Sequence, residues 1–335
     1  MPRTGRHPLK EKKIIEDQIL PSPITIATIV YIPTLSNYWR NALEVLKLFF
    51  KSLEKSTSHK YDLMVFDNGS CSEVVKYLTS LNRNGVIQYY IRSDKNLRKL
   101  GALNYLLKSA PGDYVSFADS DVYFLDGWLD KSLEVLKKFP EAGKVTALPI
   151  AGGDTTLISS KFYELANQDA SIKVKTGSII PDEYIEAHNI SIGKTLKDFN
   201  RKHPDRKDIE LKRGNIQAYL SGADFQFTIR RDAIKDVLPL IIENSQDYYD
   251  PIYSPILEKK LDRVGWWQLS TKEYLVHHMG NEIPNINKEI HWMNDHSSPI
   301  NKGEGKRKKK VIQNRILRYY LKKINNYLYR LLYEG

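Results

Sequence analysis

Strand-like and helix-like segments alternate along the first half of the chain. Short runs rich in Val, Ile, Thr and aromatic residues predict strands at Ile24–Ile32, Tyr61–Phe66, Gly85–Ser93, Tyr114–Ala118 and Lys144–Pro149. Apolar residues at helical spacing predict helices at Asn41–Ser52, Glu73–Leu81, Leu100–Ser109 and Leu129–Phe139. This alternation is typical of βαβ units. We therefore expect an α/β fold with a Rossmann-like, doubly wound mixed sheet and helices on both faces.

The pattern weakens after residue 150. Residues 151–217 are polar and rich in charge, and we expect loops and short helices there, beside the edge of the sheet. Regular structure returns with a strand at Phe225–Ile229, which leads into a helix that starts at Arg231. A helix at Pro255–Val264 and a short strand within "EYLVHHMGN" follow, so the second half adds further elements to the same fold.

Composition is that of an ordinary globular protein. The chain has 335 residues, of which 41% are hydrophobic and 27% charged. No apolar run approaches the ~18 residues of a membrane span, and the N-terminus lacks the apolar core of a signal peptide. A single cysteine, Cys71, excludes an internal disulfide and a cysteine-based zinc site. We expect a cytoplasmic protein.

The positive charge is concentrated in the C-terminal tail. The net charge is +11, and residues 302–335 contribute +9 of it. Residues 306–333 begin with a basic run and continue with an apolar stripe at helical spacing, which predicts a basic amphipathic helix. Such a helix binds anionic membrane surfaces, here the inner membrane face. Packing of the stripe on the rest of the chain and binding of RNA are the alternatives. Since the body is nearly neutral, we expect no nucleic-acid partner.

Polar residues gather where predicted strands end. The strand Tyr114–Ala118 runs into Asp119-Ser120-Asp121, and Asp67 follows an earlier strand. Carboxyl ends of parallel strands meet at one edge of a sheet, where ligands bind. Two carboxylates one residue apart supply the oxygen ligands that Mg²⁺ or Mn²⁺ prefers, although a solvated turn would have the same sequence.

The segment from Asn96 to Asp121 resembles the family 2 glycosyltransferases of the GT-A fold. The matching positions are Asn96, Ala102, Asn104, Gly112-Asp113-Tyr114 and Asp119-Ser120-Asp121, the last being the family's DxD motif. "VFDNGS" is similar to the family's "DDGS", and "IVYIPTLSN" to its "VPTYN". Two positions depart from the pattern: Arg98 stands where a glycine is usual, and Asn68 where a second aspartate is usual.

The resemblance implies an inverting, metal-dependent glycosyltransferase of the hexosyltransferase type. Such an enzyme moves a sugar from a nucleoside-diphosphate sugar to a hydroxyl of a glycan or lipid-linked acceptor, as in polysaccharide biosynthesis. One alternative is a sugar-phosphate nucleotidyltransferase of similar fold. However, "YIPTLSNYWRN" lacks the glycine-rich loop that this class usually has after its first strand. Another is a non-enzymatic adaptor that binds membrane or nucleic acid through the basic tail.

The resemblance also implies roles for particular residues. Asp119, Asp121 and His278 of "LVHHMGN" would hold Mn²⁺ or Mg²⁺, and His277 would point to the opposite face. Asp67 would accept a hydrogen bond from the nucleotide base. The other residues expected to bind the nucleotide sugar are Pro33 and Thr34 near the base, Asn96, Ser120, and the cations Arg98 and Lys99 near the diphosphate.

An inverting transfer needs a general base that takes the proton of the acceptor hydroxyl. The resemblance favours Asp250, with Asp247 as the second candidate and Asp224 as the third. Asp250 and Asp247 could instead be helix-capping groups. Trp128, Trp267 and Tyr249 are candidate aromatic platforms for a sugar acceptor.

These expectations divide the chain into five parts. They are an N-terminal extension at 1–22, a nucleotide-sugar-binding half at 23–150, a variable insertion near the acceptor site at 151–217, an acceptor and catalytic half at 218–300, and the basic amphipathic tail at 301–335.

Overall fold

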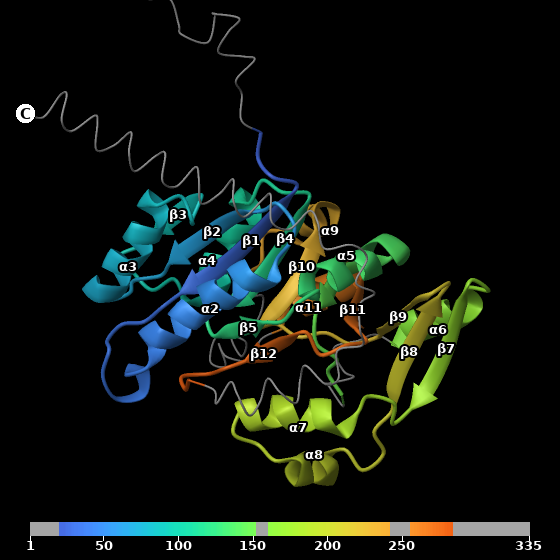
Figure 1. Cartoon of the computed structure of the whole chain (residues 1–335). Helices are drawn as coiled ribbons and strands as arrows, with labels where there is room; N and C mark the ends of the chain where they lie inside the picture. Colours follow the sequence, from blue (N-terminus) through green and yellow to red (C-terminus); the bar gives the residue numbers. More distant parts are fainter. Residues whose placement is uncertain (1–19, 152–159, 242–254, 284–335) are drawn as a thin grey trace, which may run out of the picture. The chain divides into compact units, whose positions relative to one another are not determined.

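The computed structural model describes residues 20–151, 160–241 and 255–283 (Figure 1). The predicted tail helix and the N-terminal extension up to residue 19 lie outside these residues, as do Asp247, Tyr249 and Asp250. Among the described helices, none has both the length and the apolar character needed to cross a membrane.

The described chain alternates strands and helices, as the pattern predicted. The strands are β1 (Ile24–Val30), β2 (Asp62–Asp67), β3 (Tyr89–Arg92), β4 (Tyr114–Asp119), β5 (Val122–Phe124), β6 (Ala142–Thr146), β7 (Ile172–Gly177), β8 (Asp208–Arg213), β9 (Ile216–Tyr219), β10 (Gln226–Arg230), β11 (Trp267–Thr271) and β12 (Val276–His278). The helices are η2 (Asn37–Trp39), α2 (Ala42–Ser56), α3 (Ser72–Arg83), α4 (Arg98–Ser109), α5 (Trp128–Lys138), α6 (Ser160–Gln168), α7 (Asp182–Ser191), α8 (Leu196–Lys202), α9 (Arg231–Val237) and α11 (Ile256–Val264).

A ten-stranded mixed sheet forms the centre of the fold, in the order β3-β2-β1-β4-β10-β6-β11-β9-β8-β7. Strands β3, β2, β1 and β4 run parallel to one another, and β6 runs parallel to β11. Strand β10 is antiparallel to both of its neighbours, β4 and β6. Consequently the carboxyl ends of β1, β2, β4 and β6 and the amino end of β10 share one edge of the sheet.

Helices cover both faces of this sheet. Neighbouring residues of β6 show the two faces: Lys144 reaches Glu258 of α11, whereas Val145 packs in the cluster that contains residues of α5 and α6. Strand β11 has the same arrangement: the Gln268 side chain donates a hydrogen bond to the Glu258 carbonyl of α11, and Leu269 packs in the cluster with α5 and α6. Helices α4, α9 and α11 share the other cluster. The doubly wound α/β architecture is therefore confirmed.

The polar segment 151–217 was expected to hold only loops and short helices, and this expectation is wrong. It contains β7, β8 and the first half of β9, which pair in antiparallel register and extend the sheet beyond β11. The lysines of β7 are exposed, whereas Asp208 and Glu210 of β8 are buried and pair with Arg206 and Lys272. Charged residues at both exposed and buried positions remove the apolar alternation by which a strand is recognised, which explains the failed prediction.

A second, two-stranded sheet lies beside the main one. Strand β12 pairs with β5 in antiparallel register, so that His278 stands opposite Val122. Met279 N–H donates to the carbonyl of Asp121 at 2.7 Å, which continues the pairing. Backbone hydrogen bonds thereby join the segment that follows Asp121 to the segment that contains His278.

Two residues of the resembling segment serve the fold. A Cβ at Gly112 would lie 2.6 Å from the Thr25 nitrogen, so only glycine lets the chain pass β1 this closely. The side-chain amide of Asn104 donates to the carbonyl of Leu240 and accepts from its N–H, both at 2.8 Å. Asn104 thus ties α4 to the segment after α9.

Candidate active site

The predicted site residues of β1, β2 and β4 meet at the shared edge of the sheet. Asp67 is the last residue of β2, Asp119 is the last of β4, and Pro33 follows β1. The pairing of β1 with both β2 and β4 places these ends side by side. Asp224 joins them from the loop before β10, because β10 begins at this edge.

Asp67 is fully buried, and both of its carboxylate oxygens have protein partners. Oδ1 accepts from the Ser70 N–H at 2.9 Å, which is the turn that an aspartate before Gly69 can form. Oδ2 accepts from the Tyr90 hydroxyl at 3.2 Å and lies 3.8 Å from Arg92 Nε. Burial and then the Asp67 charge raise the pKa of Tyr90 to about 12. Asp67 therefore holds the loop after β2 in place.

Asn68, the departure from the usual acidic pair, links two loops of the site. Its side-chain oxygen accepts from the Leu97 N–H at 2.8 Å, and its amide donates to Asn96 Oδ1 at 3.0 Å. Asn96 Oδ1 also accepts from the Arg98 N–H at 2.7 Å. An ionised aspartate at position 68 could accept from the Leu97 N–H but could not donate to Asn96 Oδ1. Only an amide side chain makes both hydrogen bonds.

Lys99 connects two acidic residues of the site. Its ammonium group donates to Asp119 Oδ2 at 2.9 Å and to Asp224 Oδ2 at 3.3 Å. Burial alone would lower the pKa of Lys99, but the two carboxylates raise it above its usual value. For Asp119, burial outweighs Lys99 and raises the pKa to about 6, with the charges of Asp121 and Asp224 adding to the rise. These charges form one compact cluster.

Asp121 and His278 face each other across the β5–β12 pairing. His278 Nε2 lies 3.2 Å from Asp121 Oδ2. Burial lowers the pKa of His278, but the hydrogen bond and charge of Asp121 outweigh burial, and the net pKa is raised. His277 points the other way, as predicted: it is buried, and its Nδ1 lies 2.8 Å from the Tyr274 hydroxyl. The sequence prediction that only His278 reaches the acidic motif is thus matched by the side-chain positions.

Asp121 and His278 have the chemistry of a partial cation site. Asp121 Oδ1 is buried without a hydrogen-bond partner, and a cation would supply the missing interaction. In the described part of the chain, no three His, Cys, Asp or Glu side chains are gathered tightly enough to form a complete metal site. Asp119, the third predicted ligand, is instead paired with Lys99. The donor set therefore fits Mn²⁺ or Mg²⁺ if substrate oxygens and water complete it.

Other predicted residues lie on the rim or away from the site. Pro33 and Thr34 are exposed after β1, and the Thr34 hydroxyl lies 3.0 Å from that of Ser36. Trp128 is fully buried and donates to Thr57, and Trp267 packs in the core, so neither is an exposed platform for a sugar.

His188 was missed by the sequence analysis. It lies on α7, in the segment expected to be irregular, and its ring stacks on Phe225 with centroids 5.6 Å apart. The same Phe225 ring contacts His278 edge-on at 5.7 Å. Helix α7 has weak amphipathic character, and nothing in its sequence marks His188 as different from a surface histidine.

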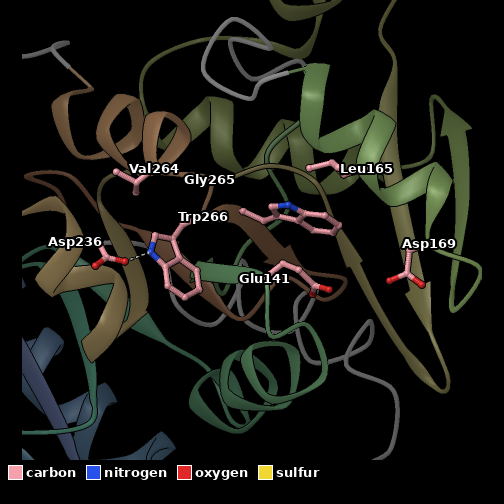
Figure 2. Close-up of a pocket in the computed structure, with 8 residues that line it drawn as sticks. Glu141, Leu165, Asp169, Asp236, Val264, Gly265 and Trp266 are labelled. Atoms are coloured by element: carbon pink, nitrogen blue, oxygen red, sulfur yellow. Dashed lines mark hydrogen bonds between the residues drawn. The ribbon is translucent and has the colours of Figure 1, made fainter.

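A cavity of about 490 Å³ lies elsewhere (Figure 2). Trp266 and Trp267 line it. Strand β11 begins at Trp267 and runs parallel to β6, so its amino end lies at the edge opposite to the candidate site. The acidic groups of the cavity already have partners: Asp236 accepts from the Trp266 indole, and Arg213 pairs with Glu141 and Asp169. The strand-end cluster, and not this cavity, therefore has the features of a reactive site.

Comparison with protein families gives one match. Residues 30–183 match the model described as "Glycosyl transferase family 2". This region contains Asp67, Asn96, Lys99 and the Asp119-Ser120-Asp121 motif, so the predicted family resemblance is confirmed where its motifs lie. No curated protein sequence matches the chain.

Solved structures resemble the chain at low sequence identity. One is GalNAc-T7 with UDP, GalNAc and Mn²⁺, with 14% identity, a TM-score of 0.45, and coverage of 76% of this chain and 42% of that one. Another is TarS residues 1–349 of S. aureus, with 11% identity, a TM-score of 0.41, and coverage of 81% and 62%. A third is a mannosyltransferase of Pyrobaculum calidifontis with GDP-Man and Mn²⁺, with 10% identity, a TM-score of 0.42, and coverage of 77% and 59%. The chain thus spans less than two thirds of each of these structures.

Proposed function

We propose that this chain, which carries a glycosyl transferase family 2 domain of the GT-A fold over residues 30–183, is an inverting, cation-dependent glycosyltransferase. It moves a hexose from a nucleoside-diphosphate sugar to a hydroxyl of a glycan or lipid-linked acceptor. The observation that supports this most is the meeting of Asp121 with His278, beside the strand-end groups Asp67 and Asp119.

The nucleotide would lie at the carboxyl ends of β1 and β2. Asp67 and Asn68 hold the loops there. The Asp67 carboxylate is fully buried against Ser70 and Tyr90, so it would accept a base N–H once the Tyr90 hydroxyl moves aside. Pro33 and Thr34 would border the base, and Asn96 and Ser120 the ribose and phosphates. A nucleotide in this place meets backbone and amide groups that are already held in position.

The diphosphate would lie between Lys99 and the Asp121–His278 pair. Lys99 is held at this place by two carboxylates, and its ammonium group would donate to phosphate oxygens. Arg98 would add a second positive charge from the start of α4. Asp121 and His278, with Asp119, would hold Mn²⁺ or Mg²⁺, which when bound neutralises the charge of the departing nucleoside diphosphate. The basic side chains and the cation would each stabilise the departing nucleoside diphosphate and so favour cleavage of its bond to the sugar.

A carboxylate near the sugar would take the proton of the acceptor hydroxyl. Asp250 and Asp247 remain the predicted bases, and both lie outside the described residues. Asp224 is at the site, where its pKa is lowered: burial raises it, but the charges of Lys99 and Lys144 and hydrogen bonds outweigh burial. A low pKa keeps Asp224 ionised at neutral pH, although it makes the carboxylate a weaker base.

Thermal unfolding with nucleotides tests this function. We would measure the shift in Tm with UDP, GDP, dTDP and CDP, with and without Mn²⁺, for the native chain and for Asp121→Asn. One nucleotide should stabilise the native chain only with Mn²⁺, because a ligand that binds the folded state alone raises stability by mass action. Asp121→Asn should keep the unliganded Tm within a few degrees and lose most of the Mn²⁺-dependent shift.

The matched control is Asp126→Asn, since Asp126 follows β5 but takes no part in the cluster described above. This variant should keep the full shift. A native chain that no nucleotide stabilises with Mn²⁺ would exclude the proposed function. A Mn²⁺-dependent shift in Tm that Asp121→Asn and Asp126→Asn retain equally would also exclude it.

A further inference from the structure

We infer that His188 of α7 binds a hydroxyl of the transferred sugar and so helps to select the donor. This inference rests on the proposed function, because it requires a nucleoside-diphosphate sugar at the strand-end cluster. It assigns a role in the site to the segment 151–217, whose sequence indicated no substrate. Four features of the described residues support it.

Firm anchoring of α7 is the first feature. Just before the helix, the N–H groups of Ile179 and Ile180 both donate to Asp208 Oδ2, at 2.8 and 2.9 Å. Arg206, which is nearly buried, pairs with Asp182 in the first turn at 3.1 Å and with Asp208 at 3.2 Å. These bonds tie the start of α7 to β8, so the helix has a defined position on the sheet.

The second feature is the packing of α7 next to the cation-binding histidine. Figure 1 shows α7 beside β12, and the two elements are in contact. The ring of Tyr184 lies 5.5 Å from that of Tyr274, just before β12. At the other end of the helix, the Ser191 carbonyl would lie 3.7 Å from a Cβ placed at Gly280, two residues after His278. Helix α7 therefore runs along the strand that carries His278.

The surroundings of the His188 ring are the third feature. Its plane is within 16° of that of Phe225, whose ring also contacts His278. His188 Nδ1 is buried and has no hydrogen-bond partner among the described residues. A buried polar atom without a partner costs stability, and native proteins seldom leave one unused. A hydroxyl group of a ligand would provide the missing partner.

The fourth feature is the charge state of the ring. Burial, and then the neighbouring His278, His277 and Lys194, lower the pKa of His188 to about 4, against a small opposing effect of Asp224. At neutral pH the ring is therefore uncharged, with one donor and one acceptor nitrogen. A neutral ring stacked on an aromatic side chain suits a sugar hydroxyl, and not a phosphate, which prefers a cation.

The order of groups along the donor explains why the sugar would be the ligand. A nucleoside-diphosphate sugar has its base at one end, its diphosphate in the middle and its sugar at the other end. The proposed base and diphosphate positions follow the same order, from β2 to the Asp121–His278 pair. Helix α7 lies next, on the far side of β12 from β1 and β2 (Figure 1). His188 is thus placed where the sugar would be.

Binding of sugar nucleotides compared with that of nucleotides tests this role. We would measure Kd by calorimetry in Mn²⁺ for UDP, GDP, UDP-glucose, UDP-galactose, UDP-N-acetylglucosamine and GDP-mannose. The readout is the ratio of the Kd of each nucleotide to the Kd of its sugar nucleotide. This ratio is the gain in affinity due to the sugar. His188→Ala should reduce this gain about 3- to 10-fold, the worth of one neutral hydrogen bond, and leave the Kd of UDP and GDP unchanged. His188→Asn should restore most of the gain, because its amide can replace Nδ1.

Two further variants separate this role from a structural one. His203→Ala removes a histidine that packs on Phe199 just after α8, within the same segment, and should leave every Kd unchanged. His188→Phe keeps the stacking on Phe225 without the nitrogens, so it should lose the gain even if His188→Ala fails to fold.

Each outcome has a separate meaning. If UDP or GDP binds with Mn²⁺ and His188→Phe keeps the full gain from the sugar, the role of His188 is excluded while the proposed function stands. If neither the nucleotides nor the sugar nucleotides bind to the native chain, both fail together.

Discussion

Arg98 occupies a backbone conformation that favours glycine. Its φ is +58°, in the left-handed region, and the resembling family usually has a glycine at this position. The bonds from the Arg98 N–H to Asn96 and from Asn68 to the Arg98 carbonyl hold the turn in this conformation. A side chain with a Cβ is strained here by roughly 1 kcal/mol. A positively charged residue therefore stands at the start of α4 in a strained conformation.

Two substitutions at position 98 separate strain from charge. Arg98→Gly should be more stable than Arg98→Ala by about 1 kcal/mol, because both lose the guanidinium group but only glycine relieves the strain. Urea unfolding measures this difference. Both variants should weaken binding of the stabilising nucleotide to a similar extent if Arg98 contacts the diphosphate. Equal stability of the two variants would show that the turn is not strained.

At the scale of elements, a buried ion pair joins β6 to α11. Lys144 Nζ pairs with Glu258 Oε1, and their side chains are 0% and 8% exposed. The Lys144 ammonium also lies 5.1 Å from the centre of the Phe227 ring. Burying both charges costs desolvation energy, so the pair adds little net stability, but either charge left alone is costly. Its effect is to fix where α11 lies on the sheet. Lys144 lies beside the loop that carries Asp224, since a Cβ at Gly222 would be 3.5 Å from its Cε.

A double-mutant cycle tests this pair. Lys144→Met should cost about 3–5 kcal/mol in the free energy of unfolding, because it leaves Glu258 buried without a partner. Lys144→Met combined with Glu258→Leu should cost clearly less than Lys144→Met alone. Urea unfolding gives these values, and the exposed pair Lys235–Asp232 is the control, at less than about 1 kcal/mol. Additive costs at positions 144 and 258 would contradict the coupling.

A second ion-pair network joins β8 to the start of β6 and the end of α6. Arg213 binds both oxygens of Glu141 at 2.8 Å and also Asp169 at 2.7 Å. Burial raises the pKa of Glu141, but the hydrogen bonds with Arg213 and with the backbone outweigh it, and the net pKa falls below 4.5. Because the folded state then binds its proton more weakly than the unfolded state, this pair stabilises the fold above about pH 4.5. The contribution is lost as the pH falls through the lowered pKa.

Replacement of Glu141 should therefore have a pH-dependent cost. Glu141→Gln should lower the free energy of unfolding at pH 7, and the difference from the native chain should shrink as the pH approaches 3. Urea unfolding at several pH values measures it. Glu134→Gln, in an exposed pair with Lys131 on α5, is the control and should have little effect at either pH. A cost for Glu141→Gln that does not change with pH would mean that packing, and not charge, is responsible.

At the scale of the whole molecule, the catalytic part and the basic tail are predicted to work separately. The candidate site uses residues between 33 and 278, whereas most of the net positive charge lies after residue 301. Basic residues near an anionic membrane contribute about 1 kcal/mol each. The tail would thus bring the site to a membrane that holds a lipid-linked acceptor.

Charge removal in the tail tests this division. The full chain with Lys306, Arg307, Lys308, Lys309 and Lys310 all changed to Gln should lose most of its binding to vesicles that contain phosphatidylserine. It should keep the native Mn²⁺-dependent nucleotide shift in Tm. Cosedimentation with anionic and with uncharged vesicles measures the binding. Undiminished binding to anionic vesicles, or binding that is equal to both kinds, would exclude an electrostatic role of the tail.

The sequence by itself determined the alternating half of the fold and the position of its acidic motif. Strands β1 to β4 and helices α2 to α5 are predicted by local periodicity, because each buries one face or run of apolar residues. Asp67 and Asp119 were placed by the rule that parallel strands end at one edge. These features depend on short segments and on one general property of α/β sheets, so a sequence is enough to find them.

Only the tertiary structure decided which distant side chains meet at this edge. The pairing of β5 with β12 brings His278 to Asp121, the packing of α7 brings His188 to Phe225, and the loop before β10 brings Asp224 to Lys99. Strands β7 to β9 likewise joined the sheet although their sequence is polar. Each of these contacts links residues far apart in the chain. Their formation depends on the packing energy of the whole sheet and not on any local pattern. The meeting of His278 with Asp121 was therefore expected only from the family resemblance. The contacts of His188 with Phe225 and of Asp224 with Lys99 were not predicted.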